Sequence, residues 1–168
     1  MVRRGFTIVE LLIVVAVMGI LLVLAVVNLR DSQGQARDTE RSTDIASISK
    51  YLESFYTSGN DSSTSYGFYP STELIGQETN YLSGIDKKAL IAPGETTIAD
   101  SFFAATNNSQ TLSGVTPQPD NTNYSYIYQP LQSDGTLCTS SVQKCRKYNL
   151  YYLKENDGTV YKVTSTHQ

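Results

Sequence analysis

Few side chains in this chain of 168 residues could do chemistry. It has one histidine, His167, and two cysteines, Cys138 and Cys145, and one acid, Glu10, interrupts an apolar run near the N-terminus. The sequence contains no H-E-x-x-H, G-x-S-x-G, P-loop or G-x-G-x-x-G motif. These residues form no catalytic set, so we predict that the chain is not an enzyme and uses neither a cofactor nor a metal.

The apolar run from Phe6 to Val27 is long enough to cross a bilayer. As a helix its 22 residues reach about 33 Å, against about 30 Å for a hydrocarbon core. Arg3 and Arg4 precede the run, which favours a cytoplasmic N-terminus and places the rest of the chain outside the cytoplasm. No convincing small-x-small cleavage site follows the run, so removal of the whole segment as a secretory signal is not expected.

Glu10 needs an explanation, because an ionisable side chain near the centre of a membrane helix costs about 2.5 to 3.5 kcal/mol. One interpretation places it near the membrane interface, in an ordinary anchor. The other interpretation is that the Glu10 side chain has a partner group.

The residues around Glu10 favour a partner. The run Gly5-Phe6-Thr7-Ile8-Val9-Glu10-Leu11 follows a short basic leader and precedes an apolar stretch. This arrangement resembles the prepilin signal of type IV pilins and pseudopilins. The resemblance implies that a prepilin peptidase cleaves between Gly5 and Phe6 and methylates the new amine of Phe6. It also implies that Glu10 pairs with the terminal amine of a neighbouring subunit. Opposite charges in a low-dielectric setting attract strongly, so such a pair would fix the register of adjacent helices.

Periodicity predicts one long helix from about Phe6 to about Thr57. Its first half is apolar. Its second half carries an apolar stripe at helical spacing, formed by Ile45, Ile48, Leu52, Phe55 and Tyr56. Gly19 and Gly34 each cost about 1 kcal/mol relative to Ala and are points where this helix could bend.

Beyond the helix, composition predicts a loop over 58–69 and irregular structure with short elements over 71–117, where Thr72 to Leu74 favours a short helix or turn. Alternating tyrosines predict a strand over 123–129, ended by Pro130. Two more β-rich runs, 148–154 and 159–164, flank an Asp-Gly step that favours a hairpin. An antiparallel sheet of three or four strands needs a cover, which the helix stripe supplies, so the predicted class is α+β.

The predicted organisation has five parts. They are a leader (1–5), the transmembrane or filament-core half of the helix (6–27), its amphipathic half (28–57), a connecting region (58–122), and the antiparallel sheet with a disulfide-closed loop (123–168).

The cysteines lie outside the cytoplasm on this interpretation, where a pair forms a disulfide by default. Cys138 and Cys145 lack C-x-x-C spacing, which disfavours a reactive dithiol. Calcium ligation by oxygens of Asp120, Asn121, Asn123 and Asp134 is an alternative without the ordered spacing of a calcium loop. The N-x-S sequences at Asn60, Asn107 and Asn123 are expected to be chance, and His167 is expected to lie in solvent beside the last strand.

Charge argues against nucleic acid as a partner, because 11 Lys or Arg face 15 Asp or Glu from Asn28 onward. The resemblance implies a structural subunit of a type IV pilus, held in the inner membrane and then assembled into a surface filament for adhesion, twitching motility or DNA uptake. Its implied partners are identical subunits, the prepilin peptidase, the membrane, the assembly platform and its motor ATPases. Two alternatives remain open: a pseudopilin of a type II secretion system, and a monomeric membrane-anchored binding module.

Overall fold

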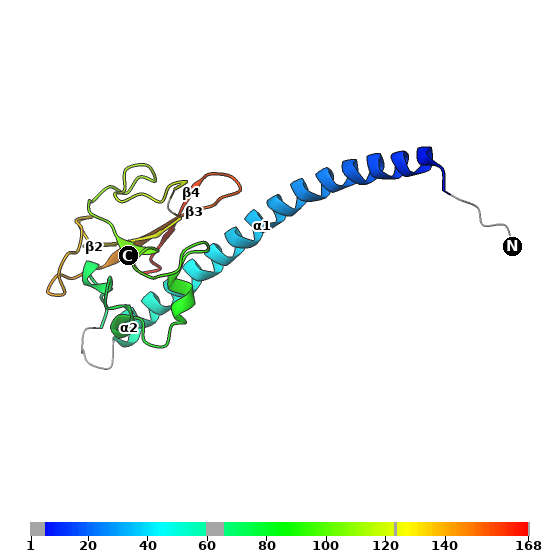
Figure 1. The fold of residues 1–168 in the computed structure, drawn as a ribbon. Helices are drawn as coiled ribbons and strands as arrows, with labels where there is room; N and C mark the ends of the chain where they lie inside the picture. Colours follow the sequence, from blue (N-terminus) through cyan, green and yellow to red (C-terminus); the bar gives the residue numbers. More distant parts are fainter. Residues whose placement is uncertain (1–5, 60–65, 123, 168) are drawn as a thin grey trace.

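The computed structural model describes residues 6–59, 66–122 and 124–167, with the side chains of residues 27 and 28 excepted. A long helix leads into a domain built on a sheet (Figure 1), which confirms the α+β class. In chain order the elements are α1 (Ile8–Ser58), η1 (Thr72–Leu74), α2 (Glu78–Tyr81), η2 (Lys87–Leu90), β1 (Phe102–Ala104), β2 (Tyr126–Leu131), β3 (Lys147–Leu153) and β4 (Val160–Thr164).

Helix α1 begins and ends where local chemistry sets its limits. Thr7 caps its first turn, and Gly59 ends it with a φ of 69°, while the Gly59 N–H still bonds to the Phe55 carbonyl. The 51 residues give a length of about 76 Å. The helix is unbroken through Gly19 and Gly34 and curves gently towards the domain (Figure 1).

The second half of α1 packs on one face of the sheet, as the apolar stripe predicts. Ile45, Ile48, Leu52 and Phe55 are all buried there, and Tyr56 is partly buried. They meet a core that includes Phe102, Tyr126, Tyr128, Tyr148, Leu150 and Tyr152. The stripe therefore joins helix and sheet in one hydrophobic core.

The sheet has the strand order β1-β2-β3-β4. Strands β2, β3 and β4 are antiparallel, and the Lys154 N–H bonds to the Thr159 carbonyl across the predicted hairpin turn, where Gly158 has a φ of 62°. The expectation of a purely antiparallel sheet is wrong at one edge, because β1 runs parallel to β2. With only three residues, β1 offers little strand pattern in the sequence.

The prediction that Pro130 ends its strand is also wrong. Pro130 lies inside β2, opposite Tyr148. The nitrogen and the carbonyl of one strand residue face the same side. The Pro130 carbonyl faces away from β3 and accepts the Cys138 N–H, so the Pro130 nitrogen also faces the side on which β1 would continue. Strand β1 already ends at Ala104, opposite Tyr128, so the absent N–H of Pro130 leaves no β1 bond unmade.

The outer face of the sheet is covered as well, which the sequence did not indicate. Gln129, fully buried in β2, donates to the carbonyls of Asn107 and Ser109 at 3.0 and 2.6 Å. Its own oxygen accepts from Asn149 and Tyr151 at 2.8 and 3.0 Å. The N–H groups of Gln129 thus hold the segment after β1 on the sheet, while its oxygen bonds to β3. A second apolar cluster, which includes Ala105, Val115, Ile127 and Tyr151, also joins that segment to the sheet.

Candidate functional site

The first half of α1 is an apolar surface that the domain does not cover. Every described side chain from Ile8 to Gln33 is exposed, and the large apolar ones between Ile8 and Leu29 are each at least 43% exposed. The first buried residue of the helix is Gly34. The helix is long and apolar enough to cross a membrane, so this surface needs either lipid or other protein around it.

Glu10 sits in the first turn of this apolar surface and closes a capping box with Thr7. The Glu10 Oε2 accepts from the Thr7 backbone N–H at 2.9 Å and from the Thr7 hydroxyl at 2.8 Å. The Thr7 hydroxyl in turn accepts the Glu10 N–H at 3.3 Å. The carboxylate is therefore held at the helix end, where the helix dipole also favours a negative charge.

One oxygen of the Glu10 carboxylate, Oε1, is left to bind another group. Both bonds from Thr7 reach Oε2, and within 6–59, 66–122 and 124–167 no donor to Glu10 Oε1 is found. A cation brought to this end of the helix by a second molecule would meet an ordered, partly satisfied carboxylate. That arrangement suits an intermolecular ion pair.

Comparisons with known proteins find two sequence matches. Residues 1–26 match the family model described as the prokaryotic N-terminal methylation motif. The chain is also 34% identical over 71 residues to the type IV major pilin protein PilA of Myxococcus xanthus (strain DK1622), over 40% of this chain and 32% of the relative. Both matches make parts of this chain similar to type IV pilins. The match spans about a third of the relative's length, and no solved structure matches.

The expected processing residues lie at the start of the described structure. Gly5 falls outside the described residues. Phe6 is 75% exposed and immediately precedes the cap residue Thr7, so its backbone nitrogen lies at the positive end of α1. Cleavage after Gly5, methylation of Phe6 and pairing of Glu10 stay predictions.

A buried ionic cluster marks the point where α1 enters the sheet domain. The Asp38 carboxylate accepts from Arg41 Nη1 at 2.7 Å and from the backbone N–H groups of Glu155 and Asn156 at 2.7 and 2.9 Å. Glu155 also binds Arg37 through two bonds of 2.8 and 2.5 Å. The cluster therefore fastens the β3–β4 turn to the helix.

The electrostatics of this junction follow from its contacts. The hydrogen bonds from Arg37 hold the pKa of Glu155 below its usual range. Arg41 is fully buried and its guanidinium lies 4.2 Å from the centre of the Tyr124 ring. A short Arg, Asp and Glu pattern on a helix is common on solvated faces, so the sequence carried no signal that these residues are buried.

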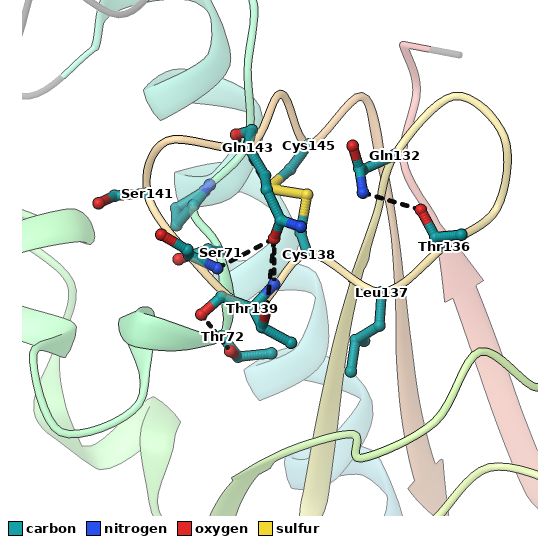
Figure 2. The surroundings of a disulfide bond; sticks show 12 residues. Ser71, Thr72, Gln132, Thr136, Leu137, Cys138, Thr139, Ser141, Gln143 and Cys145 are labelled. Atoms are coloured by element: carbon teal, nitrogen blue, oxygen red, sulfur yellow. Dashed lines mark hydrogen bonds between the residues drawn. A yellow bond between two sulfur atoms is a disulfide. The ribbon is translucent and has the colours of Figure 1, made fainter.

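Cys138 and Cys145 form the predicted disulfide, with their Cα atoms 5.8 Å apart. The bond closes a loop that Gln143 folds back on, accepting the N–H groups of Thr139 and Ser140 at 2.6 and 3.1 Å (Figure 2). The Thr72 N–H bonds to the Cys138 carbonyl and the Tyr69 N–H to the Cys145 carbonyl. Backbone bonds at the two cysteines thus tie the segment after α1 to the disulfide-closed loop.

Among the oxygens weighed as calcium ligands and the N-x-S asparagines, for which no ligand role was predicted, Asp134 and Asn107 make local contacts. Asp134 Oδ1 accepts from the N–H and hydroxyl of Thr136 in its own turn. No cluster of three His, Cys, Asp or Glu side chains able to hold a metal occurs in the part of the chain that the structure describes. The Asn107 side chain donates to the Gly114 carbonyl, and Asn60 and Asn123 lie outside the described residues.

His167 follows β4 and its side chain is 44% exposed, as expected, but it also makes contacts that the sequence did not indicate. Its ring stacks on Tyr56 at 4.3 Å between ring centres and lies 2.9 Å from Glu53. Neither partner is near it in sequence, so these contacts depend on the fold and left no trace in the local pattern.

Proposed function

We propose that this chain is a structural subunit of a type IV pilus, assembled through the apolar half of α1. The observation that carries the proposal is the exposed apolar surface between Ile8 and Leu29, with one capped carboxylate, Glu10, in its first turn. Lipid tails cover this surface before assembly, and identical helices cover it in the filament. Because both surroundings are apolar, transfer between them costs little free energy.

Processing creates the partner for Glu10. The prepilin peptidase cleaves between Gly5 and Phe6 and methylates the Phe6 amine, which keeps its positive charge. That amine pairs with Glu10 of a neighbouring subunit, while Thr7 holds the carboxylate in place. Either charge alone would be costly in an apolar filament core, so the pair favours one axial register between subunits. The methylation motif over residues 1–26 supports this sequence of events.

The cellular setting follows from the same surface. The unprocessed chain lies in the inner membrane with Arg3 and Arg4 on the cytoplasmic side, and its domain lies outside the cytoplasm. The assembly platform extracts it into a surface filament, with work supplied by cytoplasmic motor ATPases. Adhesion, twitching motility and DNA uptake are the activities such a filament would support.

Two other functions predict different observations. A pseudopilin of a type II secretion system would form a short periplasmic fibre and would be processed in the same way. A monomeric anchored binding module would keep Met1 and form no fibre. The disulfide-closed loop near the C-terminus and the missing calcium spacing favour the pilus over the pseudopilin.

Electron microscopy of sheared surface appendages tests the proposal. Strains producing the wild type, Glu10→Ala and Glu40→Ala are compared. Glu40 is an exposed acid on the same helix, outside the apolar half, and serves as the matched control. We expect filaments containing this subunit in the wild type and Glu40→Ala, and few or none in Glu10→Ala, with the variant retained in the membrane. Unchanged filaments in Glu10→Ala would remove Glu10 from assembly.

A further inference from the structure

A cavity of about 310 Å³ lies between the end of α1 and the disulfide-closed loop. Phe55 of α1 and Tyr81 of α2 lie next to each other in its lining, with their ring centres 5.7 Å apart. Phe68 also lines this cavity, which we call the loop cavity, and the loop contributes residues 141–144. Its volume is at the lower end of the range for sites that bind small molecules.

Hydrogen bonds within the domain hold the lining of the loop cavity in place. The Tyr69 N–H bonds to the Cys145 carbonyl, and the Tyr69 hydroxyl donates to Glu53 on α1 at 2.8 Å. On the loop, the Ser141 N–H donates to Glu73 at 3.1 Å. Because these bonds fix the loop and the segment facing it, a ligand would enter a formed site at little cost in conformational entropy.

The loop cavity has a positively charged rim. Lys144 Nζ and the Arg146 guanidinium lie 5.6 and 4.6 Å from the centre of the Phe68 ring, and both side chains are exposed. Within residues 6–59, 66–122 and 124–167, neither cation forms a salt bridge. Glu53 and Glu73 touch the lining as well, but both carboxylates accept hydrogen bonds from it. The ammonium group of Lys144, which lines the cavity, can therefore pair with an anionic ligand.

The other polar groups of the lining suit a sugar ring better than a purely apolar molecule. Ser71, Ser141 and Gln143 lie around the disulfide-closed loop and line the cavity beside the aromatic rings (Figure 2). The Gln143 Oε1 accepts from backbone N–H groups of its own loop, and in the described part of the chain its Nε2 has no acceptor. A sugar presents C–H groups to aromatic rings and hydroxyls to such donors, whereas an apolar ligand would leave these polar groups unpaired.

We propose that the loop cavity binds a hexuronate residue of an acidic polysaccharide, with the carboxylate on Lys144 and the ring against the aromatic side chains. A hexuronate carries its carboxylate directly on a hexose ring, so it combines the anion and the sugar in a molecule small enough for this cavity. The proposal goes beyond filament assembly and does not depend on it.

Isothermal titration calorimetry of the full chain in detergent micelles tests the proposal with trigalacturonate as the ligand. The methyl ester of trigalacturonate keeps the rings and hydroxyls but has no charge, and we expect it to bind about tenfold more weakly. Added salt should weaken binding of the acid, because Lys144 is exposed. Sialyllactose carries a bulkier acidic sugar and should bind more weakly than trigalacturonate.

Variants of two exposed lysines separate the loop cavity from a general attraction of charge. Lys144→Gln should weaken binding of trigalacturonate about tenfold, and Lys144→Arg should restore most of it because the charge is kept. The matched control is Lys88→Gln, on η2 and outside the cavity lining, which should bind as the wild type does. Far-UV circular dichroism checks that each variant is folded.

Four results would overturn the proposal. They are no binding of trigalacturonate at about 10 mM, equal binding of the acid and its ester, unchanged binding in Lys144→Gln, and tighter binding of sialyllactose. The chain is unassembled in micelles, so these results are independent of the filament experiment with Glu10→Ala, and either proposal can fail without the other.

Discussion

Asp38 and Arg41, one turn apart on α1, form a buried ion pair at the entrance of the helix into the domain. The two groups are 2.7 Å apart, with side chains 9% and 1% exposed. Asp38 also accepts the N–H groups of Glu155 and Asn156, so the pair orders the β3–β4 turn against the helix. A mechanical force transmitted from α1 to the domain passes through this ion pair and its hydrogen bonds.

Asp38→Ala should destabilise the domain strongly. It leaves the Arg41 charge buried without its main partner and two backbone N–H groups without an acceptor, at a cost of about 3 to 5 kcal/mol. The matched control is Arg37→Ala, because Arg37 is half-exposed and its ion pair with Glu155 should contribute less than about 1 kcal/mol. Urea unfolding of the full chain in micelles measures both. Equal losses for the two variants would contradict a specific role for the buried pair.

Thr7→Val should loosen the first turn of α1. Valine keeps the shape of threonine but has no hydroxyl to bond Glu10, and loss of such a cap costs about 1 kcal/mol. Exchange of the Glu10 amide should rise about fivefold in micelles, whereas Thr7→Ser should behave as the wild type. No change in Thr7→Val would show that the capping box does not order this end.

Cys138→Ser with Cys145→Ser should lower the free energy of unfolding by about 2.5 kcal/mol, from the closed loop of eight residues. The loss should equal that of the wild type measured in reductant, since both remove the same cross-link. If the reduced wild type is as stable as the oxidised protein, the disulfide does not stabilise the domain.

Asp44 and Glu155 should respond to pH in opposite directions. Burial raises the pKa of Asp44, partly offset by the bond from the Tyr126 hydroxyl. The folded state therefore binds this proton more tightly than the unfolded state, and stability from Asp44 rises as pH falls through the raised pKa. Asp44→Asn should be at least as stable as the wild type at neutral pH and lose that advantage in acid.

Glu155→Gln should show the reverse trend. Arg37 lowers the pKa of Glu155, so its contribution is present above the usual pKa of glutamate and is lost as pH falls through the folded value. Glu155→Gln should be less stable than the wild type at neutral pH, with the difference vanishing in acid. Thermal unfolding at a series of pH values measures both variants. Trends of the same sign would contradict the assigned shifts.

The sequence predicted the parts of the fold that depend on periodic patterns. The long helix, the buried stripe from Ile45 to Phe55 and the hairpin around Gly158 follow from spacing and turn chemistry alone. Strand β1 was missed because its three residues pair in parallel with a segment more than 20 positions away, and no local pattern records that pairing.

The candidate site also divides into residues that the sequence pattern reveals and residues whose contacts depend on the fold. Glu10 was found because a charged residue within an apolar run is evident from the sequence alone. Glu53 and Asp38 were missed because each is an ordinary helix acid in sequence, and only the fold brings Thr166 to one and Glu155 to the other. The contacts of His167 were missed for the same reason: its partner Tyr56 lies on a different element.

Mass spectrometry of the N-terminal peptide from sheared filaments tests the central claim most directly. The account predicts a chain that begins at Phe6 and carries one added methyl group on its amine. A chain that retains Met1, found in the membrane and absent from every filament, would contradict it.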